Sequence, residues 1–347
     1  MQLSGRAQKI YDVKLKPYLA SVEKMRIESL NTYEARLKFA KKYSLMFFGS
    51  LSLIDYIITE GDNFVFVLFA AFFYFIYVHY PTMRYNTKFT KLISVKFLPV
   101  LFKELFNFEY FNKSKKIDKI FLQNSNLIGR FTYYGSEDYF VGDVNGINLE
   151  CAELDLTRKR KDSDINVFQG IAVVLTMPFE FMSHTIVTNS GLAKSDRSLS
   201  KVNLEDLEFE KKYDTFSNNQ QAARYLITPA FMKRTLDLNN FILESFGITQ
   251  EQREQATEVN IPAPLQAILE KVANRGLVEY EFKGNKLLIL IHTGADMFET
   301  PDINKSAYDI LPIIRIEQQI NAILQITEQL KLDYLTERKL ATKKFNQ

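Results

Sequence analysis

Two long apolar runs lie near the start of the chain, at Tyr43–Thr59 and Asn63–Tyr80, with the acidic turn Glu60-Gly61-Asp62 between them. A bilayer core about 30 Å thick needs roughly 20 apolar residues in a helix, and both runs approach that length. Two helices joined by a tight turn also satisfy their own backbone hydrogen bonds, as hydrocarbon requires. The pattern therefore predicts a transmembrane helical hairpin over residues 43–80. A hairpin buried in a globular core and a re-entrant hairpin that does not cross the bilayer are the alternatives.

Basic residues flank the two runs. Residues 1–42 hold 10 Lys or Arg against 4 Asp or Glu, residues 81–119 hold 9 against 3, and residues 43–80 hold no Lys or Arg. The cytoplasmic flanks of membrane helices are enriched in Lys and Arg. We therefore expect an integral membrane protein with two spans and with both termini in the cytoplasm.

An amphipathic helix is predicted on each side of the hairpin, over residues 1–42 and residues 81–118, because apolar positions recur at intervals of three and four. Pro17 and Pro99 should break or kink these helices. The second helix is basic, so it could rest on anionic lipid beside the hairpin. Packing on the domain that follows is the alternative. The candidate membrane-surface residues are Lys88, Lys91, Lys96 and Lys103, with a second basic run at Arg158, Lys159, Arg160 and Lys161.

The pattern changes at residue 119, where short segments rich in β-branched and aromatic residues alternate with turns. Strands are predicted at Leu127–Tyr134, Tyr139–Val144, Ile147–Asp155, Val167–Leu175, Thr185–Thr188, Gly276–Phe282 and Lys286–His292. Helices are predicted at Asp206–Tyr213, Asn219–Phe246, residues 264–275 and Ile313–Leu335. Asn145-Gly146 is a good type I′ turn, and Lys283-Gly284-Asn285 predicts a second hairpin.

Strands that come in groups, instead of alternating with helices, favour an α+β fold. The fold class expected for the whole chain is α+β, with an N-terminal transmembrane helical hairpin. The hairpin should be followed by a cytoplasmic domain, residues 119–347, that consists of a largely antiparallel sheet packed with helices.

Composition adds two limits. The 347-residue chain carries a net charge of +3, but the basic excess lies beside the apolar runs and residues 120–347 are net acidic. A nucleic-acid-binding domain would carry that excess itself, so no nucleic-acid partner is expected. The single cysteine, Cys151, cannot form an intrachain disulfide and should be a buried thiol, which suits a reducing compartment.

Four segments carry a resemblance to a known family. They are Phe209–Met232 (FEKKYDTFSNNQQAARYLITPAFM), which is the most specific, Ser136–Leu154, Phe168–Val174 and the stretch LLILIHTGADMFE that ends at Glu299. The chain resembles a bacterial family that is a domain of unknown function, with members that look like inner-membrane proteins with two N-terminal helices and a cytoplasmic domain. The resemblance implies a location in the bacterial inner membrane. It implies no activity, so no catalytic residue is carried over.

Candidate chemistry is sparse. Glu153 and Asp155 share one face of a predicted strand, where two carboxylates could bind Mg²⁺ or act as acid and base. Solvated strand residues are the alternative. The three histidines are far apart in the sequence and lack zinc-site spacing, and the chain has no P-loop, dinucleotide fingerprint or GxSxG elbow. We therefore assign no catalytic residue and no cofactor.

Within Phe209–Met232, the side chains of Gln220, Gln221 and Arg224 are candidates for a polar ligand site. The alternative is structural: a helix ends near Thr228, which caps a second helix with Pro229 in its first turn. By elimination, we expect a membrane-anchored protein with a cytoplasmic domain that binds or scaffolds an anionic lipid or protein partner. The other hypothesis is a membrane-associated, metal-dependent hydrolase that uses the acidic residues of the first β-hairpin.

Overall fold

The computed structural model describes residues 4–59, 65–160, 163–189, 191–245, 276–293, 304–321, 323–324 and 327. The chain divides into two compact units. The helical unit comprises Met1–Leu101 and Glu299–Pro312, and the sheet unit comprises Phe102–Phe298 and Ile313–Gln347. Every strand in the described ranges belongs to the sheet unit.

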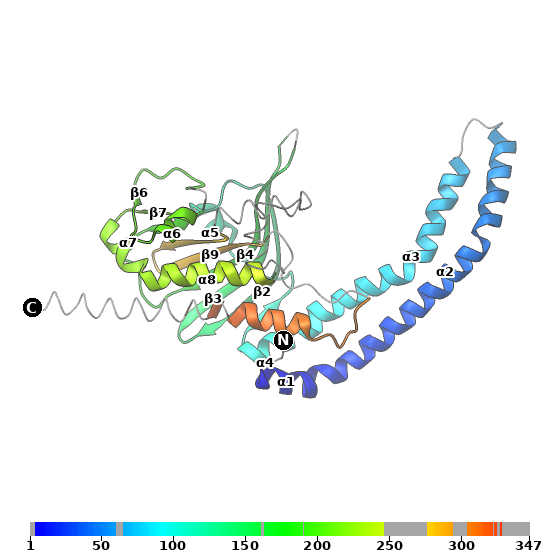
Figure 1. The fold of residues 1–347 in the computed structure, drawn as a ribbon, viewed down its shortest axis with the longest axis horizontal. Helices are drawn as coiled ribbons and strands as arrows, with labels where there is room; N and C mark the ends of the chain where they lie inside the picture. The colour runs from blue at the N-terminus through cyan, green and yellow to red at the C-terminus, as the bar shows by residue number, and fades with distance from the viewer. Residues whose placement is uncertain are drawn as a thin grey trace, which may run out of the picture. The chain divides into compact units, whose positions relative to one another are not determined.

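The helical unit is built on a pair of long helices that run side by side in opposite directions (Figure 1). The elements in chain order are α1 (Gly5–Ile10), a π-helical turn η1 (Tyr11–Leu15), α2 (Lys16–Thr59), α3 (Val65–Leu92), a second π-helical turn η2 (Ile93–Phe97) and α4 (Leu98–Phe106). The residues of α4 from Phe102 onward belong to the sheet unit. Apolar side chains such as Leu19, Val22, Tyr85 and Phe89 are buried in the helical unit.

Each π turn stands two residues before a proline. Turn η1 ends at Leu15, before Pro17, and η2 ends at Phe97, before Pro99. Proline has no backbone N–H, and its ring crowds the preceding turn of a helix. A π turn widens the helix locally, so it can accommodate the missing hydrogen bond. The breaks predicted at Pro17 and Pro99 are therefore local changes in helical winding.

The predicted transmembrane hairpin is not supported. Among the described residues, no helix is both long and apolar enough to cross a membrane. The first apolar run is the end of the 44-residue helix α2, whose earlier part is charged, and Ser44, Ser50, Ser52 and Asp55 interrupt the run. The hydroxyl groups of Ser44 and Ser50 donate to backbone carbonyls one turn earlier. The fold-class prediction is therefore wrong in its membrane-spanning part.

The sheet unit contains one antiparallel sheet with the strand order β1-β2-β3-β4-β9-β8-β5-β7-β6 within the described residues. Every strand pairing in it is antiparallel. The strands are β1 (Glu109–Phe111), β2 (Tyr133–Val144), β3 (Ile147–Arg158), β4 (Ile165–Thr176), β5 (Thr185–Thr188), β6 (Ser200–Val202), β7 (Asp214–Ser217), β8 (Val278–Lys283) and β9 (Lys286–His292). This sheet confirms the α+β part of the prediction.

The two faces of the sheet have different covers. One face holds an apolar cluster that includes Ala152, Leu154 and Leu156 of β3 and Leu122 of the short helix α5 (Lys119–Asn124). The other face is crossed by α8 (Pro229–Ser245) in Figure 1. There the rings of Phe231 and Tyr280 lie 4.9 Å apart, and Thr235 Oγ1 donates to the Tyr280 hydroxyl at 3.1 Å. Two shorter helices, α6 (Leu207–Lys212) and α7 (Gln220–Leu226), precede α8.

Local sequence signals are confirmed at several turns. Asn145 and Gly146 join β2 to β3 with positive φ angles of 55° and 82°, as a type I′ turn requires. Gly284 and Asn285 join β8 to β9. Thr228 caps α8, because its Oγ1 accepts the Phe231 N–H at 3.2 Å. The thiol of Cys151 is buried, as expected.

Other elements were not predicted. The short strands β6 and β7 lie outside the predicted strands and helices, and β1 lies within the helix predicted over residues 81–118. The strand predicted at Leu127–Tyr134 begins only at Tyr133. The helix predicted at residues 264–275 lies outside the described residues, and the C-terminal helix is described only in part, at residues 311–321, 323–324 and 327.

Candidate functional site

Strand β8 places two glutamates inside the apolar face of the sheet. Glu279 and Glu281 alternate with the apolar residues of β8, so both carboxylates lie on one face. Across the strands, Glu281 lies opposite Ile186 on β5 and Leu288 on β9, which both belong to the apolar cluster. Both glutamates are almost fully buried. Because burying an unbonded carboxylate is very costly, each needs partners within the fold.

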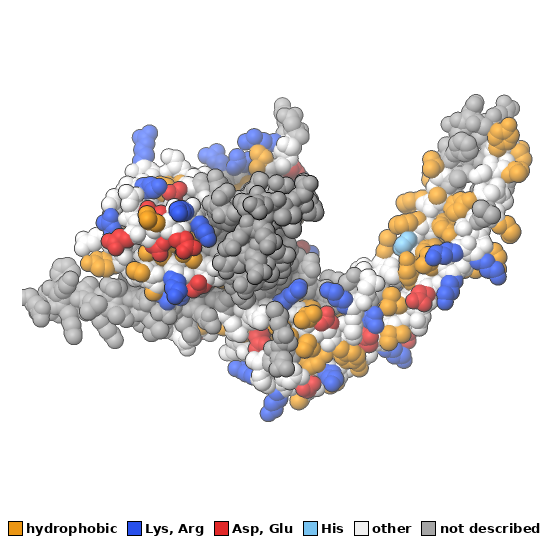
Figure 2. Space-filling view, in the orientation of Figure 1, with side chains coloured by type: hydrophobic (Ala, Val, Ile, Leu, Met, Phe, Trp, Pro, Cys, Tyr) orange, Lys and Arg blue, Asp and Glu red, His pale blue; other side chains and the backbone are white. Residues whose placement is uncertain are grey.

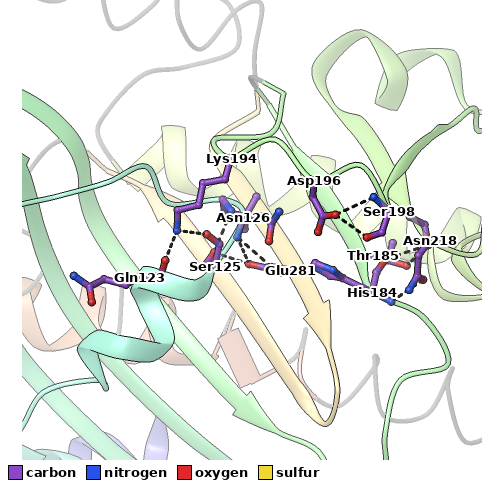
Figure 3. Close-up of polar contacts among 12 residues, drawn as sticks. Gln123, Ser125, Asn126, His184, Thr185, Lys194, Asp196, Ser198, Asn218 and Glu281 are labelled. Atoms are coloured by element: carbon purple, nitrogen blue, oxygen red, sulfur yellow. Dashed lines mark hydrogen bonds and ion pairs between the residues drawn. The ribbon is translucent and has the colours of Figure 1, made fainter.

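Three groups bind the Glu281 carboxylate (Figure 3). Ser125 Oγ donates to Oε2 at 2.5 Å, and the Asn126 backbone N–H lies 3.0 Å from Oε2 and 3.2 Å from Oε1. The imidazole Nε2 of His184 lies 2.9 Å from Oε1. These partners come from the loop after α5 and from the residue before β5. Glu281 therefore ties both segments to the centre of the sheet.

The charged form of Glu281 is favoured. Burial acts to raise the pKa of this carboxyl group, but hydrogen bonds from His184, Ser125 and the Asn126 amide outweigh burial. The pKa of Glu281 therefore lies below its ordinary value.

Lys194 holds the same loop from its other side. Its Nζ donates to the carbonyl oxygen of Ser125 at 2.7 Å and to that of Gln123 (Figure 3). These carbonyls lie at the C-terminal end of α5, where a cation is favoured. Burial lowers the pKa of Lys194, and the nearby Glu281 carboxylate partly opposes that effect.

Glu279 is bound by the same kinds of group. Thr188 Oγ1 donates to Oε1 at 2.5 Å, and the Asn189 backbone N–H donates to the same oxygen at 3.1 Å. His292 Nε2 lies 2.7 Å from Oε2. In both sites, a hydroxyl residue followed by an asparagine binds the carboxylate, with Ser125-Asn126 at Glu281 and Thr188-Asn189 at Glu279. We call these two sites the carboxylate clamps.

The clamps orient two imidazoles and fix two loops. Ser125 is 4% exposed, and its Oγ accepts the Leu127 N–H at 3.0 Å while it donates to Glu281. A nucleophilic serine needs a hydroxyl that a substrate can reach. The geometry of Ser125 therefore fits a structural anchor better than a nucleophile.

The predicted acidic pair lies on β3, away from the clamps. Glu153 is half-buried and Asp155 is exposed, and the two alternate on one face of the strand. Asp155 Oδ1 accepts a hydrogen bond from Thr157 Oγ1 at 3.2 Å. In the part of the chain that the structure describes, no group of three or more His, Cys, Asp or Glu side chains could hold a metal ion. The metal site stays a prediction.

The predicted polar ligand residues lie on α7, which Asn219 caps. Gln220, Gln221 and Arg224 are all exposed. Gln220 Nε2 donates to the Lys201 carbonyl at 3.4 Å, and Arg224 Nη2 lies 3.5 Å from the Asn203 carbonyl. These long contacts link α7 to β6 and to the residue that follows it. A ligand-binding role for the three side chains stays a prediction.

The predicted membrane-surface residues are mainly exposed. Lys88 and Lys91 lie on α3, Lys96 lies in η2 and Lys103 lies on α4, all with exposed side chains. In the second basic run, Arg158 is half-buried, Lys159 and Arg160 are exposed, and Lys161 lies outside the described residues. Arg158 Nε donates to the Arg130 carbonyl at 2.7 Å.

A large apolar surface covers α2 and α3. Figure 2 shows hydrophobic side chains gathered over both helices. The exposed fraction is 74% for Met46, 69% for Leu68 and 59% for Phe72. Soluble monomers rarely expose contiguous apolar patches larger than a few hundred square ångströms, so this surface indicates an interaction site. The hairpin surface, as we name it, comprises Met46, Phe47, Leu53, Tyr56 and Ile57 on α2 and Leu68, Phe69, Phe72, Phe73 and Phe75 on α3.

Basic side chains border the hairpin surface on both helices, before it in the sequence on α2 and after it on α3. Arg36 crosses from α2 to α3, where its Nη1 donates to the Tyr77 carbonyl at 2.8 Å and its guanidinium lies 4.7 Å from the centre of the Tyr77 ring. The other residues are mostly exposed. This basic collar consists of Arg36, Lys38, Lys41 and Lys42 on α2 and Arg84, Lys88 and Lys91 on α3.

Sequence reasoning missed the carboxylate clamps. A usable signal was present, because β8 carries Glu279 and Glu281 two residues apart between apolar neighbours and pairs with the strongly apolar β9. A carboxylate on a central strand must be buried and bound. The partners, which include His184 and His292, could not be found from spacing because 97 and 13 residues separate them from their glutamates.

Comparison with known proteins gives a family match and one distant structure. The family described as "Protein of unknown function (DUF3137)" matches residues 166–254 and 263–332. This match confirms the resemblance to a domain-of-unknown-function family, but the membrane helices that the resemblance implied are not supported. No curated protein matches the chain.

Among solved structures, the chain is similar to the crystal structure of the mycobacterial trehalose monomycolate transport factor A, TtfA. The identity is 8% and the TM-score is 0.29, over 62% of this chain and 88% of that chain. A likeness at this level carries no argument about fold or function. The chain carries a DUF3137 domain, whose function is unknown, over residues 166–254 and 263–332.

Proposed function

We propose that this chain is a lipid-bound binding module. The hairpin surface enters one leaflet of a membrane without crossing it, and the sheet unit binds or scaffolds a protein or lipid partner. The observation that carries the proposal is the exposed apolar surface on α2 and α3, bordered by the basic collar. An apolar helical surface beside basic residues is typical of helices that lie at a membrane interface.

The breadth of the hairpin surface favours lipid over a protein groove. At 3.6 residues per turn, its members occupy roughly half of the circumference of each helix. A helix that docks in a protein groove uses a narrower stripe of anchors, at i, i+3, i+4 and i+7. Lipid tails can surround a broad face from any direction. Transfer of one Phe or Leu side chain out of water contributes about 1.5–3 kcal/mol when it is complete.

The basic collar supports the same proposal. A Lys or Arg close to an anionic bilayer surface contributes roughly 1 kcal/mol. Tyr43, Tyr77 and Tyr80 lie near the collar, and tyrosine is enriched where lipid meets water. We place the attachment at the cytoplasmic leaflet of the bacterial inner membrane, since its anionic lipids would attract the collar.

Vesicle flotation of the full chain tests the proposal. We expect the wild-type protein to float with phosphatidylcholine–phosphatidylglycerol vesicles. The double variant Phe69→Ser/Phe73→Ser should bind at least about tenfold more weakly, because two large apolar side chains are lost from the lipid contact. The matched control is Leu207→Ser/Tyr225→Ser, which removes two exposed apolar side chains from the sheet unit, 74% and 50% exposed. Equal flotation of both variants would contradict the proposal.

A further inference from the structure

Three exposed lysines, two between β1 and α5 and one at the first residue of α5, lie over aromatic rings of the sheet unit. The Nζ of Lys115 is 4.0 Å from the centre of the Phe111 ring, and the Nζ of Lys116 is 5.2 Å from that of Tyr134. Lys119 stands over the Phe131 ring at 6.0 Å. The negative face of an aromatic ring attracts an ammonium group at these distances. The rings therefore hold three positive charges at defined positions.

The same rings connect these lysines to the end of β3. The rings of Phe131 and Tyr134 lie 6.0 Å apart, and the Tyr134 hydroxyl donates to the Ile117 carbonyl at 2.7 Å. Next to Phe131, the Arg130 carbonyl accepts from Arg158, and Thr132 Oγ1 accepts the Lys159 N–H at 2.9 Å. Basic residues far apart in the sequence are thus brought together. The lysine surface, as we name it, comprises Lys115, Lys116, Lys119, Arg130 and Lys159.

Two carboxylates near this surface have other partners. Glu137 forms an ion pair with Lys113 at 2.7 Å, which is why Lys113 is not counted in the lysine surface. Asp118 Oδ1 accepts the Ile120 N–H at 2.8 Å as the N-cap of α5. Two large apolar side chains lie beside the lysines, since Ile120 is 65% exposed and Tyr133 is 50% exposed.

We infer that the lysine surface binds the anionic headgroups of a lipid bilayer. The inference rests on the proposed function and adds to it a second membrane contact, which belongs to the sheet unit. Clustered lysines beside a membrane are attracted by anionic lipid, and neighbouring apolar side chains can enter the interface. Ile120 and Tyr133 supply such side chains.

The chemistry of the surface favours lipid over single-stranded nucleic acid. Proteins that bind single strands stack bases on open aromatic faces. Here the ammonium groups of Lys115, Lys116 and Lys119 lie over the rings of Phe111, Tyr134 and Phe131, and Phe131 is buried. On each of these three rings, a lysine therefore occupies a face that a stacked base would need.

Charge reversal in the full chain tests this inference. The test variant is Lys116→Glu/Lys119→Glu, and the control is Lys211→Glu/Lys233→Glu, which makes the same charge change at exposed lysines of α6 and α8. The readout is the ratio of binding to phosphatidylglycerol-containing vesicles over pure phosphatidylcholine vesicles. We expect the test variant to lose at least about tenfold of this preference at low salt, and the control to lose much less. High salt should remove the difference between the two variants.

The outcomes separate this inference from the proposed function. Equal preference for anionic vesicles in the test and control variants would overturn the inference, even where Phe69→Ser/Phe73→Ser still abolishes flotation. Conversely, if Lys116→Glu/Lys119→Glu loses the preference for anionic vesicles and the control variant keeps it, the inference is supported. This holds even where Phe69→Ser/Phe73→Ser floats normally. Displacement of the wild-type chain from anionic vesicles by single-stranded RNA at low concentration would also overturn it, in favour of a nucleic-acid surface. Retained circular dichroism in each variant excludes unfolding as the cause.

Discussion

At the scale of residues, the sheet unit depends on two buried carboxylates that are bound in the same way. Glu279 and Glu281 each accept from a hydroxyl group and from the backbone N–H of the asparagine that follows it, and each contacts an imidazole nitrogen. Removing one partner of such a group leaves an unsatisfied buried charge, which costs more than the bond itself contributes. We therefore expect both carboxylate clamps to be sensitive to single substitutions, and the clamp at Glu281 to be sensitive to pH as well.

Glu281→Gln tests the role of the charge. The folded pKa of Glu281 lies below the ordinary value of 4.5, so its stabilising effect is present above that value and is lost as pH falls through the folded pKa. At neutral pH, the variant should lose about 1–3 kcal/mol of unfolding free energy, because the glutamine amide offers the partners a weaker acceptor. The difference should shrink below pH 4.5. Urea denaturation of the wild type and of Glu281→Gln, at neutral pH and below pH 4.5, measures the difference in unfolding free energy.

An exposed glutamate is the control. Glu208→Gln, in α6, should change the unfolding free energy by no more than about 0.5 kcal/mol at either pH. A Glu281→Gln variant as stable as wild type at neutral pH would show that the clamp has no net role in stability.

At the scale of elements, the chain entering the edge strand β1 packs against a glycine, Gly142, on the neighbouring strand β2. Phe108, just before β1, is 1% exposed and stacks on Phe140 with ring centres 5.7 Å apart. A Cβ atom at Gly142 would lie 2.1 Å from Cδ1 of the Phe108 ring. Glycine is therefore required at position 142 for this ring to pack.

Gly142→Ala should lower the unfolding free energy of the sheet unit by roughly 1–3 kcal/mol, the usual range for overpacking a core. The control is Gly129→Ala, because a Cβ there would lie 3.3 Å from Nη2 of Arg158 and 3.5 Å from Cγ1 of Val167, contacts that need only a small shift. Urea denaturation followed by circular dichroism compares the two. Similar stability of both variants would mean that β1 moves to accommodate the methyl group.

Elements with strong local signals were predictable from the sequence. The Asn145-Gly146 turn, the second hairpin and the Thr228 cap follow from residue types that favour one backbone conformation. The strands β1, β6 and β7 are three or four residues long, which is too short to show the alternation of apolar and polar residues that marks a strand. Their formation depends on pairing with neighbouring strands in the folded sheet. The carboxylate clamps needed contacts between residues up to 156 positions apart, which no local pattern reports.

At the scale of the whole molecule, each unit carries one proposed membrane contact. The hairpin surface and the basic collar belong to the helical unit, and the lysine surface belongs to the sheet unit. Apolar insertion should resist salt, whereas attraction of basic side chains to anionic lipid weakens as salt screens the charges. Salt dependence therefore distinguishes insertion of the hairpin surface from the attraction of the basic collar and the lysine surface to anionic lipid.

The most direct test of the central claim measures whether the hairpin surface enters lipid. The chain has no tryptophan, so Phe72→Trp introduces a unique fluorophore into that surface, and Leu207→Trp places the same fluorophore on α6 as a control. Phosphatidylglycerol-containing vesicles should shift the Phe72→Trp emission to the blue, and brominated lipid tails should quench it, with neither effect in Leu207→Trp. An unchanged Phe72→Trp spectrum, still quenched by aqueous iodide in the presence of vesicles, would contradict the account.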